Sequence, residues 1–204
     1  MVALVSGGKL AIGFIPNVEI VTTFFVVFTL VFGWRDAFIS SMLFVLIEIA
    51  IWGFVPMWVV LYAIYWPLLV TLVYLVSMPF RKSGKYPHTS TEDIYDKSVP
   101  HKLSIINPQL SINTRVIIAA IAVGIAMTAV FGALSAIIDM IFMGGLGTGQ
   151  FWEFVLFRYI AGTWFFVTHI VSNAILLPLL VPVLTKSLYR IARQTRTRNE
   201  ANEK

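Results

Sequence analysis

Long runs of apolar residues, separated by short polar segments, dominate the pattern along this chain. Three runs, at residues 57–80, 116–142 and 162–184, reach the roughly 20 residues that an α-helix needs to cross a bilayer core of about 30 Å. Two shorter runs, 18–32 and 37–54, are separated by the sequence Gly-Trp-Arg-Asp. The pattern predicts an all-α integral membrane protein.

The first apolar run, residues 1–14, is shorter than a complete span. At 1.5 Å per residue, a helix of about 14 residues extends only some 21 Å. We interpret it as a first transmembrane helix that lacks its inner end, which brings the expected number of spans to six. Either the natural chain starts before Met1 or this helix begins inside the bilayer. Residues 151–162 are apolar but too few and too charged to span, so they predict a short interfacial helix before the sixth span.

Composition supports a membrane protein and narrows the chemistry. Hydrophobic residues make up 58% of the chain and charged residues 12%, about half the charged share of a typical soluble domain. The chain has no cysteine, which excludes disulfides and thiolate metal sites. The net charge of +5 does not indicate nucleic-acid binding, because the basic residues border apolar segments. No cleavable signal peptide is predicted, since the chain starts without a basic n-region.

The positions of lysine and arginine predict the orientation. With six spans, every basic residue except Lys9 and Arg158 lies in segments on the same side of the membrane. Because such residues are enriched in cytoplasmic loops, both termini are expected in the cytoplasm of a multi-pass plasma-membrane protein. We expect one transmembrane domain over residues 1–190, with a polar cytoplasmic loop at 81–114, and a basic cytoplasmic tail at 191–204.

Polar and aromatic side chains within the spans gather in the outer halves of the helices. At the depth of Glu48 a lone charge costs at least about 2.5 kcal/mol, so this carboxylate needs a partner or a wet cavity. His169 and Asn173 are four residues apart and therefore share a helix face. An outward cavity of this composition suits a small, partly aromatic or amphipathic solute. The candidate substrate-binding residues are Asn17, Glu19, Glu48, Trp52, Tyr62, Tyr65, His169 and Asn173.

Each of these residues also has a purely structural interpretation. Lys9 can pair with Glu19 or with Glu48 to fix helix packing, and His169 and Asn173 can form hydrogen bonds between helices. Glu19 lies near a helix end, as does Asp139, where a carboxylate is tolerated. The tryptophans near the outer surface are expected in an aromatic belt, which would comprise Trp52, Trp58, Trp66, Trp152 and Trp164.

Catalytic and nucleotide-binding motifs are missing from the sequence. The glycine-rich string Gly-Gly-Leu-Gly-Thr-Gly-Gln lacks the lysine of a phosphate-binding loop, so this chain is not expected to hydrolyse ATP. No metalloprotease or nucleophile-elbow motif is present, and we expect no enzyme activity, no metal and no cofactor. Two alternatives stay open: a membrane enzyme with Glu48 and His169 in acid–base roles, and an assembly subunit without a ligand.

Small residues recur every four positions in two helices, a spacing that allows another helix to approach closely. Both ladders suit packing within the chain, and either of them also suits docking of a membrane partner. They comprise Ala3, Gly7 and Ala11 in the first helix and Gly124, Thr128 and Gly132 in the fifth.

Two stretches resemble the substrate-binding (S) components of energy-coupling factor (ECF) type ABC transporters. They are KLAIGFIPNVEIVTTFFVVFTLVFG, residues 9–33, and AGTWFFVTHIVSNAILLPLLVPVL, residues 161–184. The resemblance implies a six-helix subunit that captures a vitamin or related micronutrient from outside, with the loop between the first two helices as a lid. It also implies docking to a membrane-embedded transporter subunit and two cytoplasmic ATPases. The positions it points to are Asn17 and Glu19, His169 and Asn173, and the ladder Ala3, Gly7 and Ala11.

Overall fold

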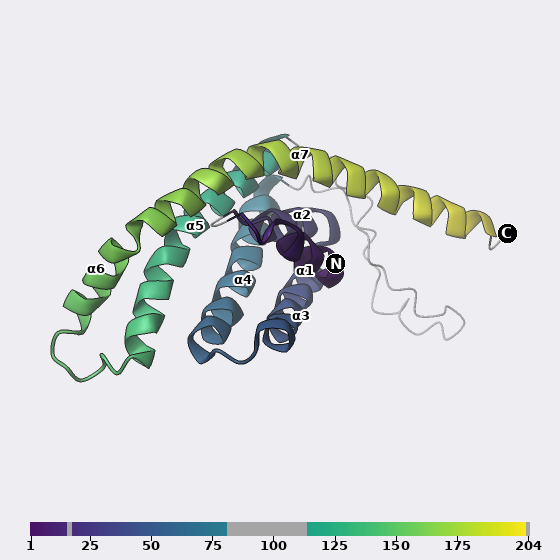
Figure 1. The fold of residues 1–204 in the computed structure, drawn as a ribbon. Coiled ribbons are helices and arrows are strands. Elements are labelled where there is room, and N and C mark those ends of the chain that lie inside the picture. The colour runs from purple at the N-terminus through teal and green to yellow at the C-terminus, as the bar shows by residue number, and fades with distance from the viewer. Residues whose placement is uncertain (16–17, 81–113, 203–204) are drawn as a thin grey trace, which may run out of the picture.

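The computed structural model describes residues 1–15, 18–80 and 114–202, and within these ranges its regular structure is entirely helical (Figure 1). The all-α prediction is therefore confirmed for the described residues. The helices are α1 (Val2–Ile12), α2 (Val21–Phe32), α3 (Trp34–Trp52), α4 (Pro56–Ser77) with the short 3₁₀ turn η1 (Met78–Phe80), α5 (Thr114–Phe142), α6 (Phe151–Ala161) and α7 (Thr163–Asn202).

Three of the described helices, α4, α5 and α7, are long and apolar enough to cross a membrane. Helices α1 and α2 have 11 and 12 residues, a length of only about 16–18 Å. Helix α3 has 19 residues but carries three charged side chains, Arg35, Asp36 and Glu48. The fold is consistent with a helical membrane protein, while the count of six spans stays a prediction.

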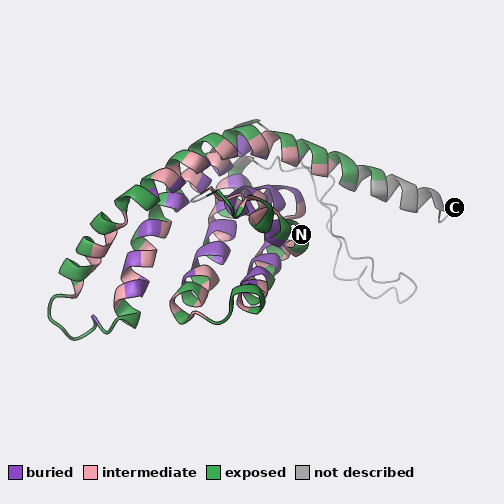
Figure 2. Ribbon diagram, in the orientation of Figure 1, coloured by how far each residue is buried: buried purple, intermediate pink, exposed green. Residues whose placement is uncertain are grey.

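Helix α2 is the centre of the bundle. Ten of its twelve residues are buried, and it packs against α1, α3, α4, α5 and α7. A helix that is apolar on all sides is stable only where other helices surround it, which explains this central position. The buried residues in Figure 2 accordingly gather where α2 meets α4, α5 and α7.

The turn between α2 and α3 is tighter than the sequence predicts. The whole segment Gly-Trp-Arg-Asp was expected to separate two helices, but only Gly33 does so. Its φ of 93° lies in the left-handed region that favours glycine, so one residue is enough to end α2 and begin α3. Trp34, Arg35 and Asp36 form the first turn of α3, where the carboxylate of Asp36 interacts favourably with the helix dipole.

Helix α7 is longer than the predicted sixth span at 162–184. It continues through the basic tail to Asn202 and has 40 residues, about 60 Å, or roughly twice the bilayer core. The segment 185–202 contains four Arg and two Ala, which favour helix, and no Gly or Pro follows Pro182. Helix α7 contains Pro178 and Pro182, and prolines inside a helix cause bends. The helix arches, and its C-terminal part runs across the direction of α4 and α5 (Figure 1).

The short helix predicted at residues 151–162 is present as α6. It has no buried residue and packs mainly against α5, to which it is joined by a glycine-rich loop. Gly144, Gly147 and Gly149 of this loop adopt positive φ values, which accounts for the glycine-rich string in the sequence. The existence of this helix is confirmed, whereas its location at a membrane interface stays a prediction.

Candidate functional site

An aromatic cluster packs in the core beside the candidate site. The Tyr65 and Trp66 rings of α4 have centroids 4.7 Å apart, and Phe25 of α2 and Phe131 of α5 pack against them at 5.3 Å and 4.9 Å. Trp66 has an exposed fraction of 0%, so its assignment to an aromatic belt is wrong. Its ring is buried because α4 places Trp66 on the face that packs against α2.

Among the described residues, two ion pairs and one histidine–carboxylate contact join residues that are far apart in the sequence. The Lys9 ammonium of α1 donates to the Glu48 carboxylate of α3, which settles the choice between Glu48 and Glu19. Arg158 of α6 contacts Asp139 of α5, with Nη2 and Nε at 2.9 Å and 3.1 Å from the same Oδ2. Both carboxylates are buried, and a buried charge is stable only when paired.

The histidine–carboxylate contact connects Glu19, which precedes α2, to His169 of α7. The distance from His169 Nε2 to Glu19 Oε2 is 2.8 Å. The imidazole stacks between Phe131 and Phe165, at centroid distances of 5.7 Å and 5.9 Å. This contact fixes the end of the α1–α2 connection to α7. Asn17, the other predicted site residue in this connection, lies outside the described residues.

Asn173 is a packing residue in this structure. Its Nδ2 donates to Thr128 Oγ1 at 3.0 Å, and the Thr128 hydroxyl donates in turn to the Gly124 carbonyl at 2.9 Å. Both side chains are buried between α5 and α7. Asn173 therefore forms the interhelical hydrogen bond that its structural interpretation predicts, and it lies on the same helix as His169 but contacts different partners.

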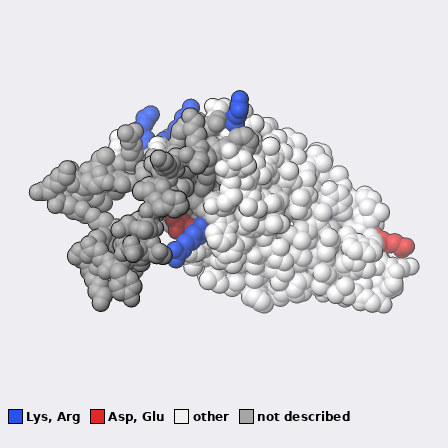
Figure 3. All heavy atoms as spheres, turned by 180° about the vertical axis from the view of Figure 1, so that it is seen from behind, with Lys and Arg blue, Asp and Glu red and all other residues white. Residues whose placement is uncertain are grey.

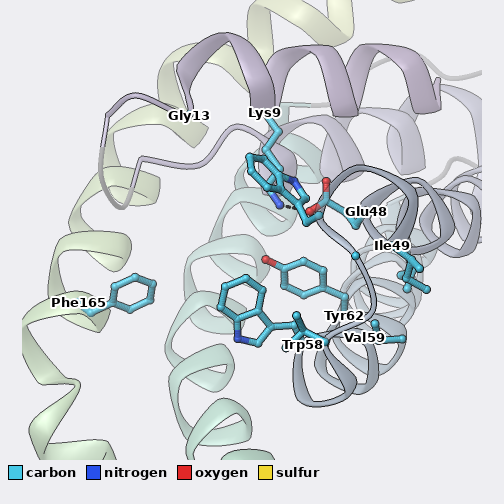
Figure 4. Close-up of a pocket in the computed structure, with 12 residues that line it drawn as sticks. Lys9, Gly13, Glu48, Ile49, Trp58, Val59, Tyr62 and Phe165 are labelled. Carbon is cyan, nitrogen blue, oxygen red and sulfur yellow. Dashed lines mark hydrogen bonds and ion pairs between the residues drawn. The ribbon is translucent and has the colours of Figure 1, made fainter.

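A cavity of about 500 Å³ opens beside Lys9 and Glu48, and we call it the first chamber. Gly13, which follows α1, and Ile49 of α3 line it, together with α4 residues and Phe165 of α7 (Figure 4). Its volume falls within the range of small-molecule sites in proteins. Its aromatic lining comprises Trp52, Trp58, Tyr62 and Phe165.

A second chamber, of about 490 Å³, lies between α4, α5, α6 and α7. It contains the Asp139–Arg158 ion pair and Ser135, and it shares Trp58, Tyr62 and Phe165 with the first chamber. Two neighbouring cavities with common aromatic walls, each with one ion pair in its lining, can hold the apolar body of a solute and its polar groups.

The predicted site residues separate into two groups. Glu48, Trp52 and Tyr62 line the first chamber, whereas Glu19, Tyr65, His169 and Asn173 line neither chamber. Glu48 and His169 are held by different partners, so the acid–base pair considered from the sequence is not assembled.

The site also contains Phe165, Arg158 and Trp58, which are not among the residues predicted from the sequence. Phe165 precedes His169 by four residues, a spacing that places both on one helix face and that offered a usable signal. Arg158 is one of two basic residues on the predicted outer side, which also set it apart. Trp58 was expected in the aromatic belt; it is exposed, and it also lines both chambers.

The exposed small-residue ladder lies on the opposite side of α1 from the core. Ala3, Gly7 and Ala11 are all exposed, and the buried residues of the helix are Val5 and Ser6.

Comparisons of the chain with protein-family models, with curated proteins and with solved structures find no match. The function is therefore inferred from the site itself.

Proposed function

We propose that this protein is a membrane-embedded subunit that binds a small, partly aromatic solute. The observation that carries the proposal is the first chamber, in which Trp52, Trp58, Tyr62 and Phe165 surround a space of about 500 Å³ next to a paired carboxylate. Mostly apolar walls with a few fixed polar groups are typical of ligand sites, because the walls supply affinity and the polar groups supply orientation.

The finer proposal is uptake of a vitamin or related micronutrient. The solute is captured from the extracellular side and passed inward by a membrane-embedded transporter subunit and two cytoplasmic ATPases. The resemblance of residues 9–33 and 161–184 to ECF S components supports this role. In this proposal the connection between α1 and α2 is the lid, and the contact of Glu19 with His169 is what fastens it.

The membrane orientation is part of the same proposal: both termini are cytoplasmic, and the chambers face outward. Charge supports it. On the face shown in Figure 3, Lys and Arg side chains gather at one end, with an acidic side chain beside them, and another acidic side chain lies at the other end, while the area between the two ends is uncharged. An uncharged belt suits contact with lipid. The exposed ladder Ala3, Gly7 and Ala11 is the proposed docking face for the transporter subunit.

The test is to identify the solute and to remove one wall of the chamber. We expect a stoichiometric small molecule in extracts of the protein purified from its native membrane, detected by mass spectrometry. Trp58→Ala should lower affinity for that molecule at least about tenfold, since Trp58 lines both chambers and its exposure leaves folding intact.

Trp164→Ala is the matched control, because Trp164 is 82% exposed and lines neither chamber. It should bind the solute like the wild type. The proposal fails if the extracts contain no solute and no member of a vitamin panel raises the melting temperature of the purified protein.

A further inference from the structure

The ammonium group of Lys9 occupies a site with the chemistry of a cation receptor. Its Nζ lies 5.2 Å from the centroid of the Tyr62 ring and 5.7 Å from that of Phe44, and it is paired with the Glu48 carboxylate. Figure 4 shows Lys9, Glu48 and Tyr62 pointing toward one another at one end of the first chamber. Aromatic faces combined with a carboxylate are the means by which proteins recognise ammonium ligands.

The carboxylate is the fixed part of this receptor. Glu48 is 8% exposed and projects from α3, which packs against α2 and α4 in the bundle. Removing its counter-charge would leave a buried anion unpaired, which is strongly unfavourable. The ionised carboxylate therefore needs a cation as its partner, but this cation need not belong to Lys9.

Lys9 is the movable part. It projects from α1, which has only two buried residues, Val5 and Ser6, and packs mainly on α2 and α3. Its ammonium is the end of a flexible four-carbon side chain, which can carry the charge out of the site without unfolding the helix. Lys9 and Gly13 also line the chamber, so withdrawal of Lys9 enlarges the same space in which a solute would lie.

We propose that the first chamber takes an organic cation, an amine or quaternary ammonium on an apolar body, and that this cation displaces Lys9 from Glu48. The inference rests on the proposed solute-binding function and names its substrate class. The exchange keeps the Glu48 carboxylate paired, and the apolar body of the solute packs against Trp52, Trp58 and Phe165. Lys9 thus holds the empty site in a paired state and competes with the solute.

An anionic solute bound by Lys9 is the opposing interpretation, and the geometry disfavours it. The charge of Lys9 is already neutralised by Glu48, and the group faces two aromatic rings. The faces of such rings are electronegative and repel anions. The two interpretations predict opposite effects of removing the Lys9 charge, which makes the proposal testable.

The experiment uses the purified full-length chain in detergent and three probes: benzyltrimethylammonium, benzyl alcohol and benzoate. Wild-type protein should bind the cation in preference to the neutral and anionic probes, as measured by calorimetry. Lys9→Met, which removes the competing charge, should bind the cation at least about tenfold more tightly, a difference that corresponds to about 1.4 kcal/mol. Glu48→Gln should bind it at least about tenfold more weakly.

Two further variants serve as a replacement and as a control. Lys9→Gln keeps a hydrogen-bond donor for Glu48 and replaces Lys9→Met if that variant is too unstable to purify. It should also bind the cation more tightly than the wild type. Lys186→Met makes the same substitution at an exposed position of α7 that lines neither chamber and should leave cation binding unchanged.

The outcomes separate this inference from the proposed function. Tighter binding of benzoate than of the cation, lost in Lys9→Met, would overturn the inference and leave solute binding standing. The inference would also be overturned, with solute binding left standing, if a solute co-purifies but no probe cation binds to wild-type protein, Lys9→Met or Lys9→Gln. Absence of any co-purified solute together with no response to vitamins or probes would overturn both.

Discussion

The small-residue ladders of α5 and α1 have the same spacing in the sequence but lie in opposite environments. In α5, Gly124, Thr128 and Gly132 are buried, and α7 packs directly on them. In α1, the equivalent face is exposed along its whole length. The α5 ladder packs against another helix of the chain, whereas the α1 ladder is exposed.

The contacts explain the difference. A Cβ on Gly132 would lie 2.8 Å from Cγ of Phe166, and one on Gly124 would lie 2.8 Å from a methyl group of Leu177. A Cβ on Gly7 of α1 would meet nothing within 4 Å. Small-residue spacing therefore predicts a smooth helix face, but only the arrangement of the other helices decides whether that face is used within the chain.

The largest expected effect comes from filling the α5 ladder. Gly132→Leu places a side chain against the rigid base of the Phe166 ring, so α7 must shift, and overpacking of this kind costs about 1–3 kcal/mol. The measurement is the unfolding midpoint in detergent. Ala133→Leu is the control, because Ala133 is the exposed neighbour on the same helix and should change stability little. Equal effects of the two substitutions would show that α7 does not pack on this face.

A smaller effect is expected from the hydrogen bond within the same ladder. Thr128→Val keeps the shape but removes the acceptor for Asn173 Nδ2, and it should destabilise by about 1 kcal/mol. Thr168→Val is the matched control, since the Thr168 hydroxyl bonds only to its own helix, at Trp164 O. A double-mutant cycle with Asn173→Leu should show coupling between positions 128 and 173. A coupling of zero would contradict the interhelical bond.

Helix positions were largely predictable from this sequence, because they depend on the lengths of apolar runs and on local breakers. The predicted run at 116–142 matches α5 within two residues, and the interfacial helix at 151–162 matches α6 within one. The errors arose where local conformation overrode composition. Gly33 alone makes a turn that four residues were expected to make, and the basic tail continues α7 because its residues favour helix.

The candidate site was predictable only in part. The depth of Glu48 required a partner, and Lys9 was one of the cations within reach, but the choice of Glu48 over Glu19 depends on how α1 lies on α3. Trp66 could not be distinguished from the belt tryptophans, because its burial comes from the packing of α2 against α4. Sequence spacing fixes which residues share a helix face, and tertiary packing fixes what that face meets.

The smallest expected effect, and the sharpest test of the comparison, lies in α1. A Cβ on Gly7 meets nothing within 4 Å, and Gly7→Leu replaces a poor helix former by a good one, so stability should stay within about 1 kcal/mol of the wild type or rise slightly. The adjacent Gly8→Leu is the matched control: its Cβ would lie 2.6 Å from the Phe24 ring of α2, and it should destabilise clearly. The measurement is the unfolding midpoint of each variant, compared with that of the wild type. If Gly7→Leu is as damaging as Gly8→Leu, another part of the chain covers the ladder, and the proposed docking face loses the open surface on which it depends.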